Sequence, residues 1–350
     1  MTEHADNNFP PLPDDNALPA TPPPEPIVTA PMAESAATDQ PNSSAAPPLA
    51  DPWPFGDAHS AYVTSHSNEI AQPPFNGLQL PDDLRISWSW IHLSFFLFSI
   101  LACFTVLPVL LAICIQAVSH RPQLQLQQLA SNASFLVVTQ VLCFGAVMFF
   151  LYVTLGVLRD APFWTTLGWK KLNLKARGEF LKPWMFPLMG GALALFVAVG
   201  SSRVKDVENT PIEQLLKDPH TAILLMAMAV LVAPLVEETV FRGYLYPLFA
   251  SNFAKLAAYY GVDSSQAVRF GTASGVLVTG FLFGMLHGWQ LGWNVTLVSL
   301  LTLVGVIFTL VRAATGTVLA SFLMHLGYNS LIAVITIILT KGFTVAPPGH

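Results

Sequence analysis

Three ionisable side chains interrupt one of the most apolar stretches of this sequence. Glu237, Glu238 and Arg242 lie in the run VEETVFRG, between TAILLMAMAVLVAPLV and YLYPLFA, neither of which carries a charge. A charge at the centre of a bilayer costs about 2.5–3.5 kcal/mol on insertion scales, so these side chains must face protein or water. They are the first place in the chain to look for chemistry.

Helix geometry divides the three charges into a pair and a remainder. Glu238 and Arg242 are four residues apart and share a helix face, which predicts an ion pair. Glu237 is turned by about 100° from Glu238 and needs a partner from another segment. A purely structural interpretation, in which all three charges lock the helix to its neighbours, is less favoured. One pair suffices for locking, and a second buried acid adds cost.

Two histidines and an amide on later apolar segments are candidate partners for Glu237. His287 follows FLFGML, and His325 and Asn329 lie four residues apart in HLGYN. Counted at about 1.5 Å per residue from the expected helix ends, the four side chains reach similar depths. Each histidine alone suggests a hydrogen-bonded core residue, and Asn329 alone suggests a helix-packing group. The predicted convergence of all four is the stronger indication of a site.

A carboxylate beside an imidazole in a poorly hydrated cavity can hold and deprotonate a water molecule. A second imidazole with a nearby amide can donate hydrogen bonds to a developing oxyanion. This combination predicts hydrolysis of an amide without a covalent intermediate. Glu237, His287 and His325 would also form an adequate zinc set with an open position for water. The sequence leaves the zinc and metal-free versions open.

Composition predicts the elements that must position these residues. The chain has 350 residues, of which 53% are hydrophobic and only 11% are charged, whereas a soluble domain carries roughly a quarter charged residues. A bilayer span needs about 20 apolar residues. We therefore expect an all-α, polytopic helical membrane protein with about seven transmembrane helices. They are expected at 90–117, 134–158, 183–202, 221–250, 270–288, 291–313 and 317–340. The fourth run exceeds the bilayer core, so we expect it to be tilted or partly outside.

Three regions follow from this pattern. Residues 1–85 hold 17 of the 28 prolines and are rich in acids, which predicts a disordered Pro-rich acidic tail. Residues 86–200 hold accessory transmembrane helices and an amphipathic loop, and residues 201–342 hold the candidate site.

The orientation of the chain follows from its basic residues. The loop between the second and third spans carries more of them than any other loop, which predicts a cytoplasmic loop and a cytoplasmic N-terminus, with the protein in the inner membrane of a cell. These residues are Arg159, Lys170, Lys171, Lys175, Arg177 and Lys182.

Three short motifs resemble those of a known family. EETVFR, from Glu237 to Arg242, resembles the EExxxR motif of the CPBP (CAAX protease and bacteriocin-processing, or Abi) intramembrane endopeptidases. FGMLH, from Phe283 to His287, is similar to the FxxxH motif, and HLGYN, from His325 to Asn329, to the HxxxN motif. The motifs occur in the family's order, each on a separate expected span. The resemblance covers about residues 200–335.

The resemblance implies that 201–342 is an intramembrane protease core. It implies that Glu237 and His287 activate water and that His325 and Asn329 line the oxyanion side. Glu238, Arg242 and Phe283 carry over as supporting motif residues. The implied substrate is a membrane-associated or lipidated (CAAX-like) protein or peptide, and we expect the bilayer but no nucleic acid as a partner. Members of the family are often called metalloproteases, but a metal-free glutamate mechanism also fits.

Two other functions compete with proteolysis. Intramembrane Glu, His and Arg residues also build relays in proton-coupled transporters, although the chain shows no internal repeats of the kind that many carriers have. A non-catalytic membrane immunity or binding protein that keeps the fold is the second alternative, and the complete set of Glu and His residues argues against it.

Overall fold

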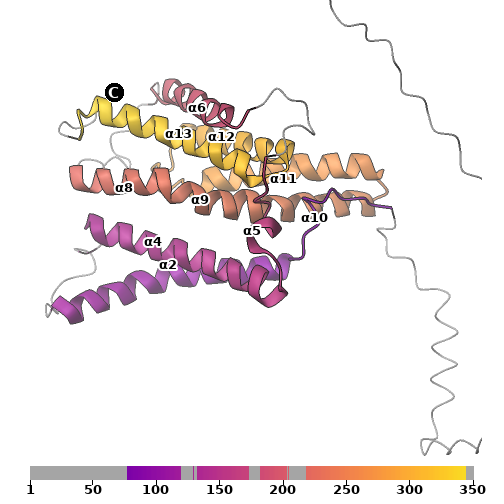
Figure 1. Cartoon of the computed structure of the whole chain (residues 1–350), viewed down its shortest axis with the longest axis horizontal. Helices are drawn as coiled ribbons and strands as arrows, with labels where there is room; N and C mark the ends of the chain where they lie inside the picture. Colours follow the sequence, from indigo (N-terminus) through magenta and orange to yellow (C-terminus); the bar gives the residue numbers. More distant parts are fainter. Residues whose placement is uncertain are drawn as a thin grey trace, which may run out of the picture. The chain divides into compact units, whose positions relative to one another are not determined.

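The computed structural model describes residues 77–119, 129, 132–172, 182–202, 204 and 218–343. Most of the predicted disordered tail, residues 1–76, lies outside the described residues. Within the described residues every regular element is a helix, which confirms the all-α prediction (Figure 1).

The described helices reproduce the order of the expected spans. They are α2 (Trp90–Ser119), α4 (Ala133–Leu151), α5 (Phe163–Thr166), α6 (Met185–Ser201), α8 (Pro219–Leu231), α9 (Ala233–Glu238), α10 (Tyr246–Tyr259), α11 (Ser264–Leu286), α12 (Val295–Thr315) and α13 (Val318–Leu339). Two π-helices, η1 (Tyr152–Gly156) and η5 (Thr239–Leu245), and a short 3₁₀ helix, η2 (Val157–Arg159), continue α4 and join α9 to α10.

Six helical stretches are long and apolar enough to span a membrane, and α6, with 17 residues, is a shorter apolar helix. Six of the seven predicted spans therefore have full length in the described part of the chain.

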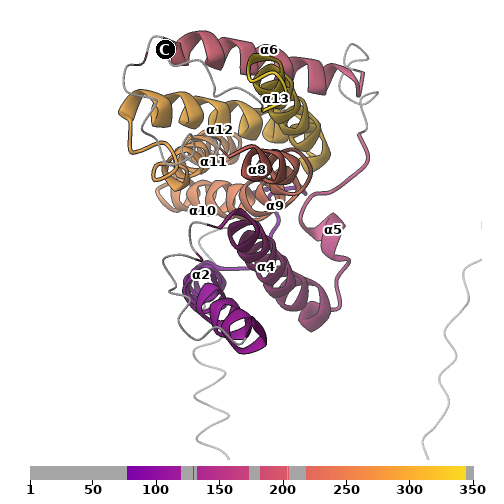
Figure 2. The same cartoon turned by 90° about the vertical axis from the view of Figure 1, so that its left-hand side faces the viewer.

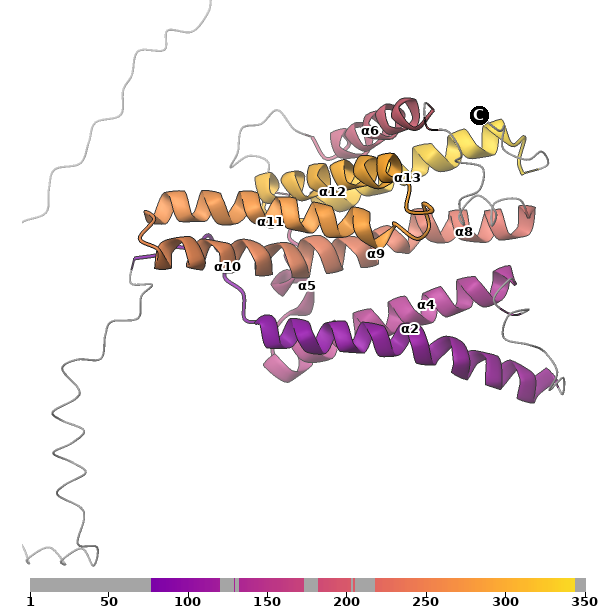
Figure 3. The same cartoon turned by 180° about the vertical axis from the view of Figure 1, so that it is seen from behind.

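The fourth span is longer than predicted. Helix runs from Pro219 to Tyr259, 41 residues, which corresponds to about 60 Å of helical rise against a hydrocarbon core of about 30 Å. The hairpin of α10 and α11 extends past the ends of the neighbouring helices (Figure 3). At this length the segment must be tilted or lie partly outside the apolar layer, which keeps both alternatives of the prediction open.

Two prolines interrupt this long helix on either side of the glutamates. Pro234 has no N–H for the carbonyl four residues earlier, and the helix breaks between α8 and α9 at Val232. Pro247 likewise cannot close an α-turn, and before it the backbone widens into the π-helix η5. There the N–H of Tyr246 bonds to the carbonyl of Phe241, five residues back. Glu237 and Glu238 thus end a helix of only six residues.

The helices pack around two main apolar clusters. The first joins α2 and α4 to α9, η5 and α11, and it includes Phe96, Leu151 and Tyr244. The second joins α6 to α12 and α13 through Phe186 and its neighbours. Viewed toward the helix ends, α2 and α4 form one layer, α6 lies beside α13, and α8 to α12 fill the space between (Figure 2). The first two candidate motifs lie in that central group, and the third lies on α13.

Glycines bring the backbones of α6 and α13 into direct contact. A Cβ built on Gly327 would lie 2.1 Å from the carbonyl oxygen of Pro187, and one on Gly190 would lie 1.9 Å from that of Met324. Neither distance is sterically possible, so only glycine permits this packing. Small residues at helix contacts are the usual basis of close association in lipid.

Residues 77–85 differ from the prediction of a disordered tail that extends to 85. Leu84 is 2% exposed and packs with Tyr246, Ala250 and Val276. Asp83 forms an ion pair with Arg312 at 3.2 Å. The composition of residues 1–85 taken together is that of a disordered segment. Its last residues nevertheless include a short apolar and acidic stretch that packs against α10 and α12. The ordered chain therefore begins at least eight residues before the predicted boundary.

We expect Gly327→Ala to lower the apparent melting temperature of the purified protein, because the new methyl group forces α13 away from α6. Gly145→Ala in α4 is the matched control, since nothing lies within 4 Å of its Cβ position and alanine favours a helix by about 0.5–1 kcal/mol. Thermal unfolding in detergent measures both variants. Equal melting temperatures would show that α6 does not pack on α13 as described.

Candidate active site

The ion pair predicted between Glu238 and Arg242 is present. Arg242 Nη1 donates to Glu238 Oε1 at 3.0 Å, and neither side chain is exposed. Arg242 Nη2 donates to the carbonyl oxygen of Gly305 on α12 at 2.9 Å. The pair is therefore held between α9, η5 and α12.

His325 joins both glutamates through its two ring nitrogens. Its Nδ1 is 3.0 Å from Glu238 Oε1, and its Nε2 is 3.8 Å from Glu237 Oε2. An ionised carboxylate can only accept a hydrogen bond, so the Nδ1 of His325 carries the hydrogen. In neutral His325 the Nε2 lone pair then faces Glu237.

His287, at the end of α11, also directs its Nε2 atom toward Glu237. It lies at the C-terminal cap of α11, where its Nδ1 is 2.7 Å from the carbonyl oxygen of Phe283. Because a carbonyl only accepts, this Nδ1 also carries the hydrogen. The Nε2 of His287 is 3.9 Å from Glu237 Oε1.

Glu237 thus lies between two imidazoles, each directed at a different carboxylate oxygen. Separations of 3.8 and 3.9 Å are too long for direct hydrogen bonds. The Glu237 side chain is 18% exposed, whereas that of Glu238 is fully buried. Of the two acids, Glu237 is the one that a small molecule can reach.

Asn329, on α13, bonds to the backbone of α8. Its Nδ2 donates to the carbonyl oxygen of Ala229 at 2.7 Å, near the end of α8. This bond links α13 to α8 just before the proline break. Among the described residues, Asn329 forms no hydrogen bond with Glu237 or either histidine, and the predicted oxyanion role stays a prediction.

Aromatic rings enclose the buried guanidinium and both histidines. The Cζ of Arg242 lies 4.6 Å from the ring centroid of Phe283 and 5.4 Å from that of Phe308, within the range of cation–π attraction. The Phe283 ring also lies 4.8 Å from that of His287 and 5.9 Å from that of His325. Phe283 therefore contacts all three polar groups of the site, which gives its motif position a physical reason.

Three supporting contacts escaped the sequence analysis. The Gly305 carbonyl accepts from Arg242, Phe308 stacks on His325 at 4.8 Å, and Trp169 Nε1 donates to Thr239 Oγ1 at 3.1 Å. Thr239 is the first residue of the π-helix that follows Glu238. Glycine, phenylalanine and tryptophan are common in any membrane segment, so no residue type marked these positions.

Glu237, His287 and His325 are also the residues that would form the predicted zinc set. Within the described residues, no group of three or more His, Cys, Asp and Glu side chains is arranged to hold a metal ion. The 3.8 and 3.9 Å between Glu237 oxygens and histidine nitrogens exceed the roughly 3.3–3.6 Å between ligand atoms around a tetrahedral zinc. Glu237, His287 and His325 do not fit a zinc site in this arrangement.

Comparison with known proteins gives one match. Residues 219–331 match the family model described as Rce1-like, type II CAAX prenyl endopeptidase Rce1-like, which covers about a third of the chain. All the motif residues lie inside that range, so the match covers the whole candidate site. No curated protein and no solved structure gives a match. With its long apolar helices, the chain is an integral multi-pass membrane protein.

We expect Glu238→Gln to lower the stability of the protein as well as its activity. The change leaves Arg242 as an uncompensated buried charge, and breaking a buried pair in this way costs about 3–5 kcal/mol. Thermal unfolding and size-exclusion chromatography in detergent measure the loss. A variant that folds normally but is inactive would instead move the essential acid from Glu237 to Glu238.

Proposed function

We propose that residues 219–331 form an intramembrane endopeptidase that hydrolyses a peptide bond of a membrane-associated or lipidated protein or peptide. The observation that supports this most directly is the placement of Glu237. Its two oxygens each lie within 4 Å of a different imidazole Nε2, and both imidazoles are oriented through their Nδ1 atoms. The Rce1-like match, a peptidase family, supports the same reaction class.

The cluster is arranged to take a proton. With both histidines neutral, Glu237, Glu238 and Arg242 sum to one negative charge, and both Nε2 atoms present lone pairs toward Glu237. Every group that faces the centre is then an acceptor, so a water molecule there would be held by its hydrogens and would direct its oxygen lone pairs outward. That is the orientation a nucleophilic water needs.

The proposed reaction uses these groups in two steps. As the water oxygen attacks the carbonyl carbon, its proton passes to the Glu237 carboxylate, assisted by His287, and the carbonyl oxygen becomes an oxyanion. When the C–N bond breaks, that proton moves to the leaving nitrogen, so Glu237 returns to its starting state.

The oxyanion side is assigned to His325 and Asn329. His325 can donate from Nε2 only as an imidazolium, which forms when Glu237 passes the water proton on to that nitrogen. The buried carboxylate of Glu238, bonded to Nδ1, stabilises this charged form, and the proton returns through Glu237 when the leaving nitrogen takes it. Asn329 uses one amide hydrogen for Ala229 and retains a second for the substrate.

The setting of the reaction is proposed from the bilayer and the charge pattern. We place the chain in the inner membrane with a cytoplasmic N-terminus, because basic residues gather between the second and third spans. The substrate then approaches within or at the surface of the same bilayer. Lipidation of the substrate is the finer part of this proposal, and it rests on the similarity to CAAX prenyl endopeptidases alone.

Glu237→Gln is expected to abolish cleavage while the protein still inserts and folds, because the amide keeps the shape but cannot accept the proton. Comparative peptide analysis of membranes from cells that produce either protein measures the activity. Asp160→Asn, the same chemical change at an exposed turn, is the matched control. Identical membrane peptides from the Glu237 variant and the parent would refute the assignment, and would favour a carrier or a non-catalytic binding protein.

Treatment with a zinc chelator is expected to leave cleavage unchanged, because the proposed steps require only the carboxylate, imidazole and amide groups. The measurement compares the parent protein before and after chelation and dialysis. Loss of cleavage that added zinc restores would mean that Glu237, His287 and His325 close around a metal, and would replace the metal-free version.

A further inference from the structure

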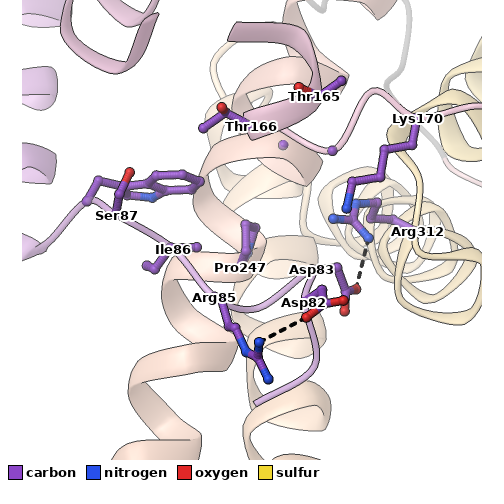
Figure 4. A pocket seen from close by; sticks show the side chains of 13 residues that line it. Asp82, Asp83, Arg85, Ile86, Ser87, Thr165, Thr166, Lys170, Pro247 and Arg312 are labelled. Atoms are coloured by element: carbon purple, nitrogen blue, oxygen red, sulfur yellow. Dashed lines mark hydrogen bonds and ion pairs between the residues drawn. The ribbon is translucent and has the colours of Figure 1, made fainter. Parts of the chain in front are cut away.

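A polar cavity lies at the end of the bundle where α2 begins and α12 meets α13. It encloses about 200 Å³, roughly seven times the volume of a water molecule in the liquid. Its walls come from residues 82–88, from the segment that follows α5, and from the starts and ends of η5, α10 and α12 (Figure 4). None of the residues assigned to the proposed active site lines it.

The cavity contains more positive than negative side chains. Arg85, Lys170 and Arg312 line it together with Asp82 and Asp83. The acids are already used, since Asp83 pairs with Arg312 at 3.2 Å and Asp82 with Arg85 at 3.1 Å. Among the described residues, no carboxylate lies within 4.0 Å of the Lys170 ammonium. One positive charge is left over.

Two cations converge on one side of this space. The side chain of Lys170 extends toward the guanidinium of Arg312, while Arg85 turns away toward Asp82 (Figure 4). Arg312 is only 1% exposed and is held close by Gly168, whose Cβ position lies 2.8 Å from Arg312 Nη2. Neighbouring cations repel one another unless an anion lies between them. Asp83 supplies one such anion, and a bound ligand would supply the second.

The position of the cavity fits a membrane surface. The backbone N–H and C=O of Lys170 bond to the hydroxyl of Thr317, the residue that caps α13. Trp90 and Trp164, each 47% exposed, belong to the α2 start and to α5 beside the cavity, and exposed tryptophans are typical of the lipid headgroup level. Basic pockets between transmembrane helices on the cytoplasmic side bind anionic headgroups.

We propose that this cavity binds a phosphodiester group, as in the headgroup of an anionic phospholipid. The single surplus charge matches the one negative charge of a phosphodiester, whereas a phosphate monoester carries about −1.5 to −2 at pH 7. Lys170 supplies the ion pair, and the hydroxyl groups of Ser87 and Thr166, which also line the cavity, can donate hydrogen bonds. A phosphodiester can come from a lipid, and free phosphate is the other source of the same oxygen chemistry.

The test uses the full chain, purified in detergent and stripped of lipid. Dioctanoyl phosphatidylglycerol, dioctanoyl phosphatidylcholine and inorganic phosphate are titrated into it, and calorimetry or native mass spectrometry measures binding. Lys170→Ala is expected to weaken phosphatidylglycerol binding by about tenfold, the effect of losing one charge-assisted hydrogen bond. Lys171→Ala is the matched control, because its side chain is also exposed but does not line the cavity.

The outcomes separate a specific site from general attraction to charge. Weaker phosphatidylglycerol binding in the Lys170 variant alone supports the site. If inorganic phosphate binds the parent as tightly as phosphatidylglycerol and is weakened by the same variant, the natural ligand is free phosphate. Equal affinity in the parent and both variants overturns the proposal, as does equal weakening in both variants. Melting temperatures of the variants verify folding, and no arm requires proteolysis, so the result stands apart from the proposed activity.

Discussion

The buried ion pair of Glu238 and Arg242 is the interaction around which the other helices of the site are arranged. Removing two charges from water is expensive, and only well-placed partners offset that cost. Arg242 finds them in a carboxylate, a backbone carbonyl and aromatic rings from α11 and α12. The same carboxylate also orients His325 on α13. One pair thereby fixes the mutual positions of α9, η5, α11, α12 and α13, and a catalytic arrangement around Glu237 becomes possible only once they are fixed.

Irregular backbone on either side of the two glutamates also helps to position the side chains of the site. A continuous α-helix from 219 to 259 would carry the two glutamates with no freedom to adjust their direction. Pro234 and Pro247 instead isolate a six-residue helix and a π-turn between two regular segments. The π-helix accommodates an extra residue per turn, and such turns frequently occur at functional sites because they re-aim the side chains beside them. Here Glu238 and Arg242 meet across its first turn, and Glu237 is left facing the histidines.

The positions of the charged and imidazole groups were predictable because such groups are rare in apolar segments. Spacing alone predicted the Glu238–Arg242 pair, and matched depths predicted that Glu237 would meet His287 and His325. The roles of these residues, and that of Asn329, remain predictions. The π-helix and the Gly305 carbonyl were not predictable, because the first depends on backbone energetics and the second on a group that every residue carries. The expected bounds of the fifth span, 270–288, were both late, since α11 runs from Ser264 to Leu286. Because the helix ends before 288, His287 caps it rather than lying within it.

The ion pair between Asp83 and Arg312 has a consequence for how the chain is assembled. Its two residues are 229 positions apart, and every described membrane-spanning helix except α13 lies between them. During synthesis the segment before α2 emerges first, yet its partner guanidinium exists only after α12 has been made. Asp83 therefore has no ion-pair partner until nearly the whole polypeptide has been inserted. Docking of this segment would then be one of the last events of folding, and it would mark a completed helical bundle.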